Sequence, residues 1–318
     1  MEFLCQLTKW QVDGRSLALD TEKTGRVSIT PVMPGVIQVR LSQVLPWKAE
    51  RPSPSLTVDP ASWVDVAPPR VEEFADHLLA RFPGVAVRVE KDPVRLQYWA
   101  VGPDEEPAGA PLLADAPEGG LFRDGWDVGA RFALDPADRF YGLGEPEQTQ
   151  GPIPFDHRGR RYPIWNKHFP APSRLVLPLL INPRGYGLFV DNPWPAEWDL
   201  GTDGKTFTYR ASGGQICYYL ITGPQMPAIL EQLTRLTGRP ALPPKWALGL
   251  LQSKYGYRNR AEVEQLVKTF RAKGIPLDCV ILDLFWFKEM GDLAFDRSAF
   301  PDPASMIRDL KKQGVRIE

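Results

Sequence analysis

The sequence predicts a protein of two domains: a mostly antiparallel β-sandwich, followed by the first elements of a parallel α/β domain. Three observations carry this prediction. Residues 1–238 consist mostly of short apolar runs separated by Pro and Gly, a pattern typical of a sandwich. Residues 245–318 alternate apolar runs with two amphipathic helical patterns. Between them, residues 239–244 (RPALPP) have the Pro-rich composition of a linker.

In the first domain, β-type runs dominate, and the 33 prolines of the chain disfavour long helices there. Eight such runs predict strands: Arg26–Thr30, Val36–Leu41, Val85–Lys91, Val94–Val101, Arg174–Ile181, Gly187–Asp191, Thr206–Ala211 and Gln215–Ile221. Two segments have helical spacing instead. The apolar residues of 71–81 (Val71, Phe74, Leu78, Leu79) predict one helix, and those of 226–236 predict a second helix just before the linker.

In the second domain, the predicted order is strand, helix, strand, helix, strand. The strands are expected at Trp246–Leu251, Leu277–Phe287 and from Val315 onward. The first helix has Asn259 as its N-cap and ends at Gly274, and the second begins at Asp302–Pro303 and ends at Gly314. This order demands parallel pairing with helical crossovers, so it could open either a doubly wound sheet or a (β/α)8 barrel.

Asp283 is the residue on which we expect the function to depend. It follows the buried run Ile281–Leu282, and ligands of parallel α/β domains meet the carboxyl ends of the strands. Its position alone is compatible with a catalytic acid, a metal ligand or a strand-end cap.

Bulk properties exclude several classes of partner. The formal charge of -1 and the pI near 6.4 give no reason to expect nucleic acid or an anionic membrane surface. No apolar run reaches the ~20 residues of a membrane helix, and the N-terminus lacks the features of a secretory signal. The three cysteines are scattered, which indicates a reducing, cytoplasmic location and no disulfide framework. The three histidines lie in unlike contexts, so we expect no metal site, and we expect no cofactor.

Two further segments could have a role in binding. The aperiodic stretch Glu145–Ser173 is rich in Arg and contains Trp165, so it predicts either a lid over a site or a solvated loop. The carboxylates Asp191, Glu197 and Asp199 lie near Trp194 and Trp198 in sequence, as in a sugar platform, although solvated carboxylates give the same pattern.

An ordered set of short motifs resembles one known family, glycoside hydrolase family 31. The motifs are Phe140–Glu145 (FYGLGE), Gly185–Phe189 (GYGLF), Thr237–Pro240 (TGRP), Pro243–Gly249 (PPKWALG), Tyr255–Tyr257 (YGY), Ile275–Asp278 (IPLD), Asp283 and Phe300–Pro303 (FPDP). Each motif is weak alone, but together they cover most of residues 130–318 in the family's order.

The resemblance implies a galactose-mutarotase-like β-sandwich (1–238) followed by a (β/α)8 TIM barrel, of which 245–318 would be the first two βα units. It also implies retaining hydrolysis of α-linked glucosides by two aspartates, which follow the fourth and sixth barrel strands. Both are therefore expected beyond Glu318, and none of the residues present is assigned to catalysis. We expect the 318-residue chain alone to be inactive, because a retaining glycosidase needs both carboxyl groups. We also expect it to be poorly soluble, because a barrel cut after two βα units leaves an open strand edge and uncovered apolar faces.

The resemblance also implies sugar-binding roles. Asp283 matches an aspartate that hydrogen-bonds glucose hydroxyls, and Tyr255 matches an aromatic residue of the same subsite. Leu284 falls at an apolar wall position, and Trp286 replaces the more usual Tyr. Trp165–Asn166 matches a pair found in some members, some of which bind the sugar through an Asp at the position that His168 occupies here.

The function predicted is that of an α-glucosidase-type enzyme acting on an α-glucan or α-glucoside oligosaccharide. Within the same chemistry, 4-α-glucosyltransferase and α-xylosidase are alternatives, and residues 282–293 also resemble the transglucosylase branch. A non-catalytic carbohydrate-binding protein is the alternative from another class. The sequence does not indicate the oligomeric state.

Overall fold

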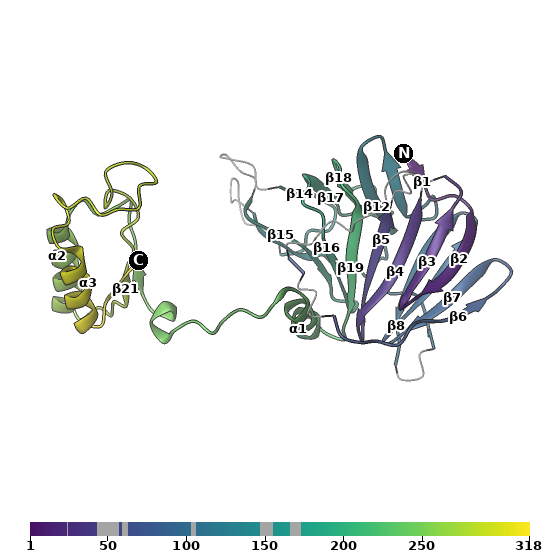
Figure 1. Ribbon diagram of the computed structural model, residues 1–318, viewed down its shortest axis with the longest axis horizontal. Helices are drawn as coiled ribbons and strands as arrows, with labels where there is room; N and C mark the ends of the chain where they lie inside the picture. The colour runs from purple at the N-terminus through teal and green to yellow at the C-terminus, as the bar shows by residue number, and fades with distance from the viewer. Residues whose placement is uncertain (24, 43–56, 59–62, 103–105, 147–154, 166–172) are drawn as a thin grey trace. The chain divides into compact units, whose positions relative to one another are not determined.

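The computed structural model describes residues 1–23, 25–42, 57–58, 63–102, 106–146, 155–165 and 173–318. The chain divides into two compact units, Met1–Arg239 and Pro240–Glu318, each with its own core. The first unit carries almost all of the strands, and the second carries α2 and α3 (Figure 1).

The first unit is built from antiparallel sheets (Figure 1). The described part of the largest has the order β13 (Tyr141–Pro146), β15 (Ser173–Asn182), β16 (Tyr186–Val190), β19 (Ile216–Thr222), β5 (Val36–Ser42), β4 (Arg26–Met33), β3 (Ser16–Thr21), β2 (Leu7–Asp13). A second has the order β1 (Glu2–Phe3), β11 (Leu121–Asp124), β12 (Asp127–Ala133), β18 (Thr206–Ala211), β17 (Ala196–Asp199), β14 (Arg161–Ile164). A third has the order β10 (Leu113–Ala114), β9 (Val94–Ala100), β8 (Val85–Lys91), β7 (His77–Phe82), β6 (Arg70–Glu73).

Side chains from all three sheets form one core, because alternate residues of each strand point to the same face. In β18, Phe207 and Tyr209 are buried while Arg210 lies partly exposed. Burying such a ring stabilises the fold by about 1.5–3 kcal/mol. The hydroxyl groups of Tyr98 and Tyr218 hydrogen-bond to each other at 2.6 Å, so neither buried hydroxyl is left without a partner.

Helix α1 (Met226–Thr237) lies where its apolar spacing predicted a helix. Its buried residues Ile229, Leu233 and Leu236 pack in a cluster with Phe189 of β16 and Tyr219 of β19. The helix therefore covers part of the largest sheet immediately before the chain leaves the first unit.

The second unit is a short parallel sheet with its crossover helices. Its elements are η2 (Lys245–Leu248), β20 (Leu251–Gln252), α2 (Arg260–Ala272), β21 (Cys279–Val280), α3 (Pro303–Lys312) and β22 (Arg316–Ile317). β20 and β22 both pair with β21 in parallel. This is the strand–helix order with which a TIM barrel begins, as the fold prediction required.

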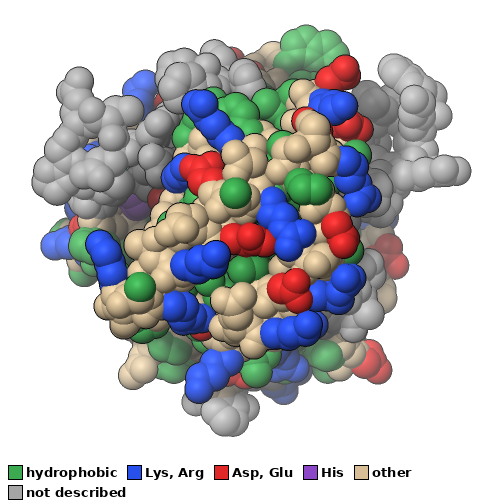
Figure 2. Space-filling view, turned by 90° about the vertical axis from the view of Figure 1, so that its left-hand side faces the viewer, with side chains coloured by type: hydrophobic (Ala, Val, Ile, Leu, Met, Phe, Trp, Pro, Cys, Tyr) green, Lys and Arg blue, Asp and Glu red, His purple; other side chains and the backbone are tan. Residues whose placement is uncertain are grey.

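Both helix caps confirm the signals in the sequence. The side chain of Asn259 accepts a hydrogen bond from the backbone N–H of Glu262 at 2.9 Å, and the Glu262 carboxylate accepts one from the N–H of Arg258 at 2.7 Å. Asp302 accepts from the N–H of Ser305 at 3.2 Å. On the face shown in Figure 2, basic and acidic side chains are interspersed.

The predicted helix at residues 71–81 is wrong. The segment forms β6 and β7 of a hairpin, with Phe74 and His77 stacked at 4.5 Å in the turn. Leu78, Ala80 and Phe82 are fully buried with the period of two expected of a strand. The helical spacing arose because the turn shifts the alternation between the two strands.

The predicted strand at residues 246–251 is mostly wrong. Residues 245–248 form a 3₁₀ turn after Pro243–Pro244, and only Leu251 of the predicted range lies in β20. Leu248 is 76% exposed, so the apolar run from which the strand was predicted is not a buried one. Among the residues that the structure describes, no helix is long and apolar enough to cross a membrane.

Candidate functional site

A pocket of about 410 Å³ lies at the carboxyl ends of β21 and β22 in the second unit. Its walls are mostly apolar, and two carboxylate side chains reach it. The lining residues are Ile281, Leu282, Asp283, Trp286, Phe295, Ile307, Ile317 and Glu318. Pockets with apolar walls and a few polar groups are the usual form of a small-molecule site.

The strand that leads into the pocket explains the position of Asp283. Val280 and Leu282 are buried in the cluster that includes Val263 of α2 and Met306 of α3. β21 ends at Val280, and the exposed Asp283 lies in the loop just after the buried Leu282. The sequence therefore uses the buried residues to fix the strand and leaves the next carboxylate at its open end.

The backbone at Asp283 is held in an uncommon conformation. Its φ is +60°, in the left-handed region that Asp tolerates better than most residues. The indole Nε1 of Trp286 donates a hydrogen bond to the Asp283 carbonyl at 3.0 Å, which closes the turn. The side chain of Asp283 is exposed, and its carboxylate has no hydrogen-bond or ion-pair partner among the described residues.

Tyr255 lies in the loop after β20, and its side chain is 79% exposed. Its ring meets the edge of Phe285 at 6.0 Å between centroids. Gly256 makes this approach possible: it has φ +74°, and a Cβ there would collide with the Phe285 ring and lie 2.7 Å from the Leu284 carbonyl oxygen. The loops that follow β20 and β21 are thus packed against each other through a glycine.

Aromatic rings support one wall of the pocket. Trp286 packs on Phe295 at 4.9 Å, and Phe295 packs on the buried Phe300 at 5.8 Å. Leu284 is half-buried but does not line the pocket. Nearby, the Lys254 ammonium lies 4.8 Å from the centre of the Tyr257 ring, and burial raises the pKa of the Tyr257 phenol.

The predicted site residues are therefore only partly brought together. Asp283 and Trp286 line one pocket, while Tyr255 and Leu284 stand beside Phe285 and Gly256. His168 lies outside the described residues. Sequence reasoning missed Phe285, Gly256, Phe295 and Ile307; the Tyr255–Tyr257 motif, with its central glycine, was the available signal for the loop contact.

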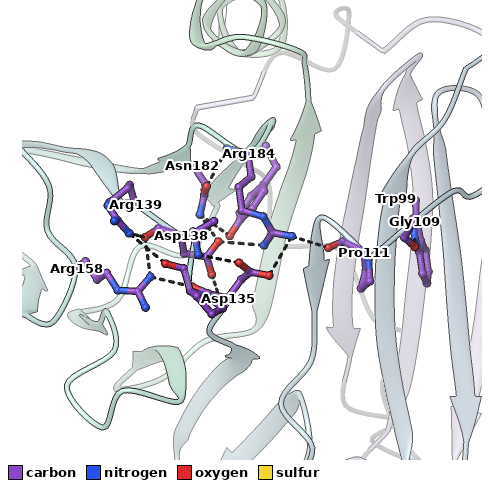
Figure 3. A network of polar contacts seen from close by, with 12 residues as sticks. Trp99, Gly109, Pro111, Asp135, Asp138, Arg139, Arg158, Asn182 and Arg184 are labelled. Carbon is purple, nitrogen blue, oxygen red and sulfur yellow. Dashed lines mark hydrogen bonds and ion pairs between the residues drawn. The ribbon is translucent and has the colours of Figure 1, made fainter.

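In the first unit, Asp138 is the centre of a buried polar network (Figure 3). Its carboxylate accepts hydrogen bonds from Asn182 Nδ2 at 2.8 Å, from Arg184 Nη1 at 3.1 Å and from the backbone N–H of Asp135 at 2.7 Å. Arg158 donates to the carbonyl oxygens of Asp135 and Asp138 at 2.8 and 2.7 Å. The network ties the start of β13 to the β15–β16 turn.

The same network fixes one end of the predicted lid stretch. Asp156 accepts from the backbone N–H of Phe140 at 2.9 Å, and the N–H of His157 donates to the Phe140 carbonyl at 2.8 Å. Burial lowers the pKa of His157. The described part of the stretch is not all loop, because Arg161–Ile164 forms β14, and Trp165 after it is 43% exposed.

The residues near Trp194 and Trp198 that could have formed a sugar platform do not lie together on one surface. Trp198 is buried against Tyr209 at 5.2 Å and takes no part in a surface. The Asp199 carboxylate pairs with Arg161 at 3.2 Å and accepts from Thr202. Trp194, in contrast, is half exposed. Among the described residues, no group of three or more His, Cys, Asp or Glu side chains is placed to hold a metal ion.

Two family models match the chain. Residues 26–199 match the glycosyl hydrolase 31 N-terminal galactose mutarotase-like domain, and residues 240–317 match the glycosyl hydrolases family 31 TIM-barrel domain. Together they span both units.

Similar curated proteins are glycosidases. The chain is 34% identical to alpha-glucosidase 2 of Bacillus thermoamyloliquefaciens over 241 residues, which cover 73% of this chain and 29% of that protein. It is 30% identical to an alpha-xylosidase of Saccharolobus solfataricus over 199 residues, which cover 60% of this chain and 26% of that protein. The chain thus spans less than a third of the length of either relative.

Among solved structures, a Flavobacterium johnsoniae GH31 dextranase complexed with glucose has a TM-score of 0.86. The match covers 100% of this chain and 38% of the dextranase at 23% identity, which supports the fold alone.

Proposed function

Because the chain belongs to glycoside hydrolase family 31, we propose that it supplies the sugar-holding part of a retaining α-glucosidase. The substrate would be an α-glucan or an α-glucoside oligosaccharide. The observation that carries the proposal is the Asp283 carboxylate, which is exposed at the edge of the pocket with no protein partner among the described residues.

A carboxylate in this position suits a sugar hydroxyl pair. It can accept two charge-assisted hydrogen bonds, each shorter and stronger than a neutral one, and so fix the orientation of a ring. The Trp286 indole beside it offers an apolar face to the C–H side of the sugar. Tyr255 and Leu284 are proposed to line the same subsite, and His168 to contact an outer sugar unit.

Hydrolysis itself needs two carboxyl groups about 5–5.5 Å apart, one as nucleophile and one as acid/base. Family resemblance assigns neither role to a residue of this sequence. Asp283 and Glu318 are the carboxylates that reach the pocket. We propose that Asp283 binds and orients, and that residues 1–318 alone do not hydrolyse glucosides.

The test is an assay of two proteins: the product of the complete coding sequence and the 318-residue chain. The proposal predicts glucose release from maltose and from p-nitrophenyl α-glucoside by the first protein only. Hydrolysis by the 318-residue chain that disappears in Glu318→Gln would contradict it. Absence of hydrolysis by both, with retained glucan binding, would favour a non-catalytic carbohydrate-binding protein.

The second candidate activity is α-xyloside hydrolysis, favoured by the similarity to an alpha-xylosidase. A p-nitrophenyl α-xyloside assay run in parallel separates the two. Longer oligosaccharides formed from maltose would instead indicate 4-α-glucosyl transfer. We also propose a cytoplasmic location, because all three cysteines are free thiols.

A further inference from the structure

Two tryptophans stand exposed at one end of the six-stranded sheet of the first unit. Trp126 lies in the turn between β11 and β12 and is 89% exposed; Trp194 precedes β17 and is 50% exposed. Val128 of β12 and Ala196 of β17 both pair with Ala211, so the two strands flank the end of β18. Since neighbouring strands lie about 4.8 Å apart, the two strand ends are roughly 10 Å apart.

The Trp194 ring is held in place by its surroundings. It lies against the backbone of Gly213 and Gly214, where an added Cβ would come within 2.9 and 2.7 Å of the ring. The Asn192 amide oxygen accepts from the backbone N–H of Trp194 at 2.8 Å, and the Asn192 Nδ2 donates to the Gly213 carbonyl at 3.0 Å. Glycine therefore lets one side of the indole pack flat while the ring remains half exposed.

Trp126 is presented by a tight hairpin. Gly125, with φ +65°, occupies the first position of the two-residue turn, where hairpins favour glycine. Asp124 and Asp127 on either side both accept from Arg210 of β18, at 2.6 and 2.7 Å. An ordered ion-pair cluster thus occupies the strand ends beside Trp126, next to the end of β17.

We propose that this surface, formed by Trp126, Trp194 and the Asp124–Arg210–Asp127 cluster, binds a neutral glucan chain. The proposal rests on the substrate class of the proposed function but uses no residue of the Asp283 pocket. Indole faces stack on the C–H faces of sugars, and carboxylates and guanidinium groups hydrogen-bond to hydroxyls. Two indole rings at strand ends roughly 10 Å apart suit a linear chain of several sugar units.

The charges on this surface favour a neutral polyol over other partners. An apolar protein surface would have to desolvate the ion-paired cluster, which costs free energy. The Met1 ammonium also pairs with Asp124, at 3.0 Å, so the cluster holds two carboxylates and two cations and offers a polyanion no net positive charge. A neutral sugar chain can hydrogen-bond to the ion-paired groups, and it brings no charge that the surface would have to neutralise.

The test is isothermal titration of the 318-residue chain with maltoheptaose. Trp126→Ala and Trp194→Ala are each expected to raise Kd roughly two- to tenfold, as the loss of one ring contact predicts. Gly213→Ala keeps both tryptophans but displaces the Trp194 ring, so it should weaken binding similarly. Phe74→Ala, which removes another exposed ring of the first unit, should leave Kd unchanged.

Three results would overturn the inference. The first is no binding by the wild-type chain. The second is unchanged binding by the tryptophan variants together with loss in Asp283→Asn, which places the glucan in the pocket and leaves the proposed function intact. The third is a light-scattering mass that falls in the tryptophan variants without an effect on glucan binding, which identifies the surface as a contact between copies of the chain.

Discussion

Asp138 of the first unit and Asp283 of the second are aspartates in opposite surroundings. Asp138 is 1% exposed and accepts three hydrogen bonds from side chains and backbone (Figure 3). Asp283 is exposed, in a left-handed backbone conformation, and its carboxylate has no partner among the described residues. A buried carboxylate whose hydrogen bonds are all made within the protein stabilises the unit that holds it. An exposed carboxylate at a pocket, with no protein partner, can still accept hydrogen bonds from a ligand.

The first way to test this contrast is to remove the buried carboxylate. Asp138→Ala should lower the free energy of unfolding by about 3–5 kcal/mol, because Arg184 and Asn182 lose their partner in a buried site. Urea unfolding of the first unit measures the change. Glu231→Ala, which breaks an exposed ion pair with Arg239, serves as the control and should stay within about 0.5 kcal/mol. A decrease in the free energy of unfolding below 1 kcal/mol for Asp138→Ala would show that the buried carboxylate does not stabilise the first unit, and so would contradict the contrast with Asp283.

Asp115 is a buried carboxylate that the fold does not fully satisfy. It accepts from the Leu96 N–H at 2.8 Å, but its Oδ1 has no hydrogen-bond partner in the part of the chain that the structure describes. Burial raises its pKa to about 7, against the opposing effects of the Leu96 hydrogen bond and the Arg95 charge. The tyrosines Tyr98 and Tyr218 are the other titratable groups near it.

A raised folded-state pKa means that the folded protein binds this proton more tightly than the unfolded chain. The stability it contributes is complete below about pH 4 and decreases by up to ~1.4 kcal/mol per pH unit until about pH 7. Asp115→Asn should abolish this slope and stabilise the protein at neutral pH. Urea unfolding of both proteins between pH 5 and 8 measures it; parallel pH profiles would contradict the assignment.

The loop contact beside Asp283 can be tested with a pair of glycines. Gly256→Ala and Gly274→Ala both place Ala at a positive φ, which costs about 1–2 kcal/mol. Only at Gly256 does the new Cβ also meet Phe285, since nothing lies within 4 Å at Gly274. We expect Gly256→Ala to cost about 1 kcal/mol more in urea unfolding. Equal costs would show that the two loops do not constrain each other.

The cap of α3 can be tested at Asp302. Asp302→Ala removes the acceptor for the Ser305 N–H and also places Ala at a positive φ, so it should cost about 2 kcal/mol of stability. Asp302→Asn keeps the acceptor and tolerates the φ of +43° at this position. If the Ala and Asn variants have the same Tm in thermal unfolding, this cap does not stabilise the second unit.

The sequence predicted elements best where one local signal decided them. Asn259 and Asp302 marked the starts of α2 and α3, and β8 and β18 have the predicted bounds. It failed where a turn shifted the alternation of apolar residues, as at residues 71–81, and where an apolar run remained exposed, as at Leu248.

The candidate site was predictable only in part. The buried apolar run was identified, but the strand predicted at Leu277–Phe287 is formed only at β21 (Cys279–Val280), so Asp283 and Trp286 lie in the loop after it. The contact of Gly256 with Phe285 and the pairing of Asp138 with Arg184 are tertiary, so no local pattern announces them. Likewise, sequence proximity grouped Trp194 with Trp198, but Trp198 is buried within β17, whereas Trp194 lies before the strand and stays half exposed.

The most direct measurement compares stability and catalysis for Asp283→Asn in the product of the complete coding sequence. Because the carboxylate has no partner among the described residues, we predict an unfolding free energy within about 0.5 kcal/mol of wild type. Because it would lose charge-assisted hydrogen bonds to the sugar, kcat/KM for maltose should fall about 100-fold or more. A variant with kcat/KM within threefold of wild type, or one that unfolds much more easily, would contradict the role of Asp283 as the sugar-holding residue.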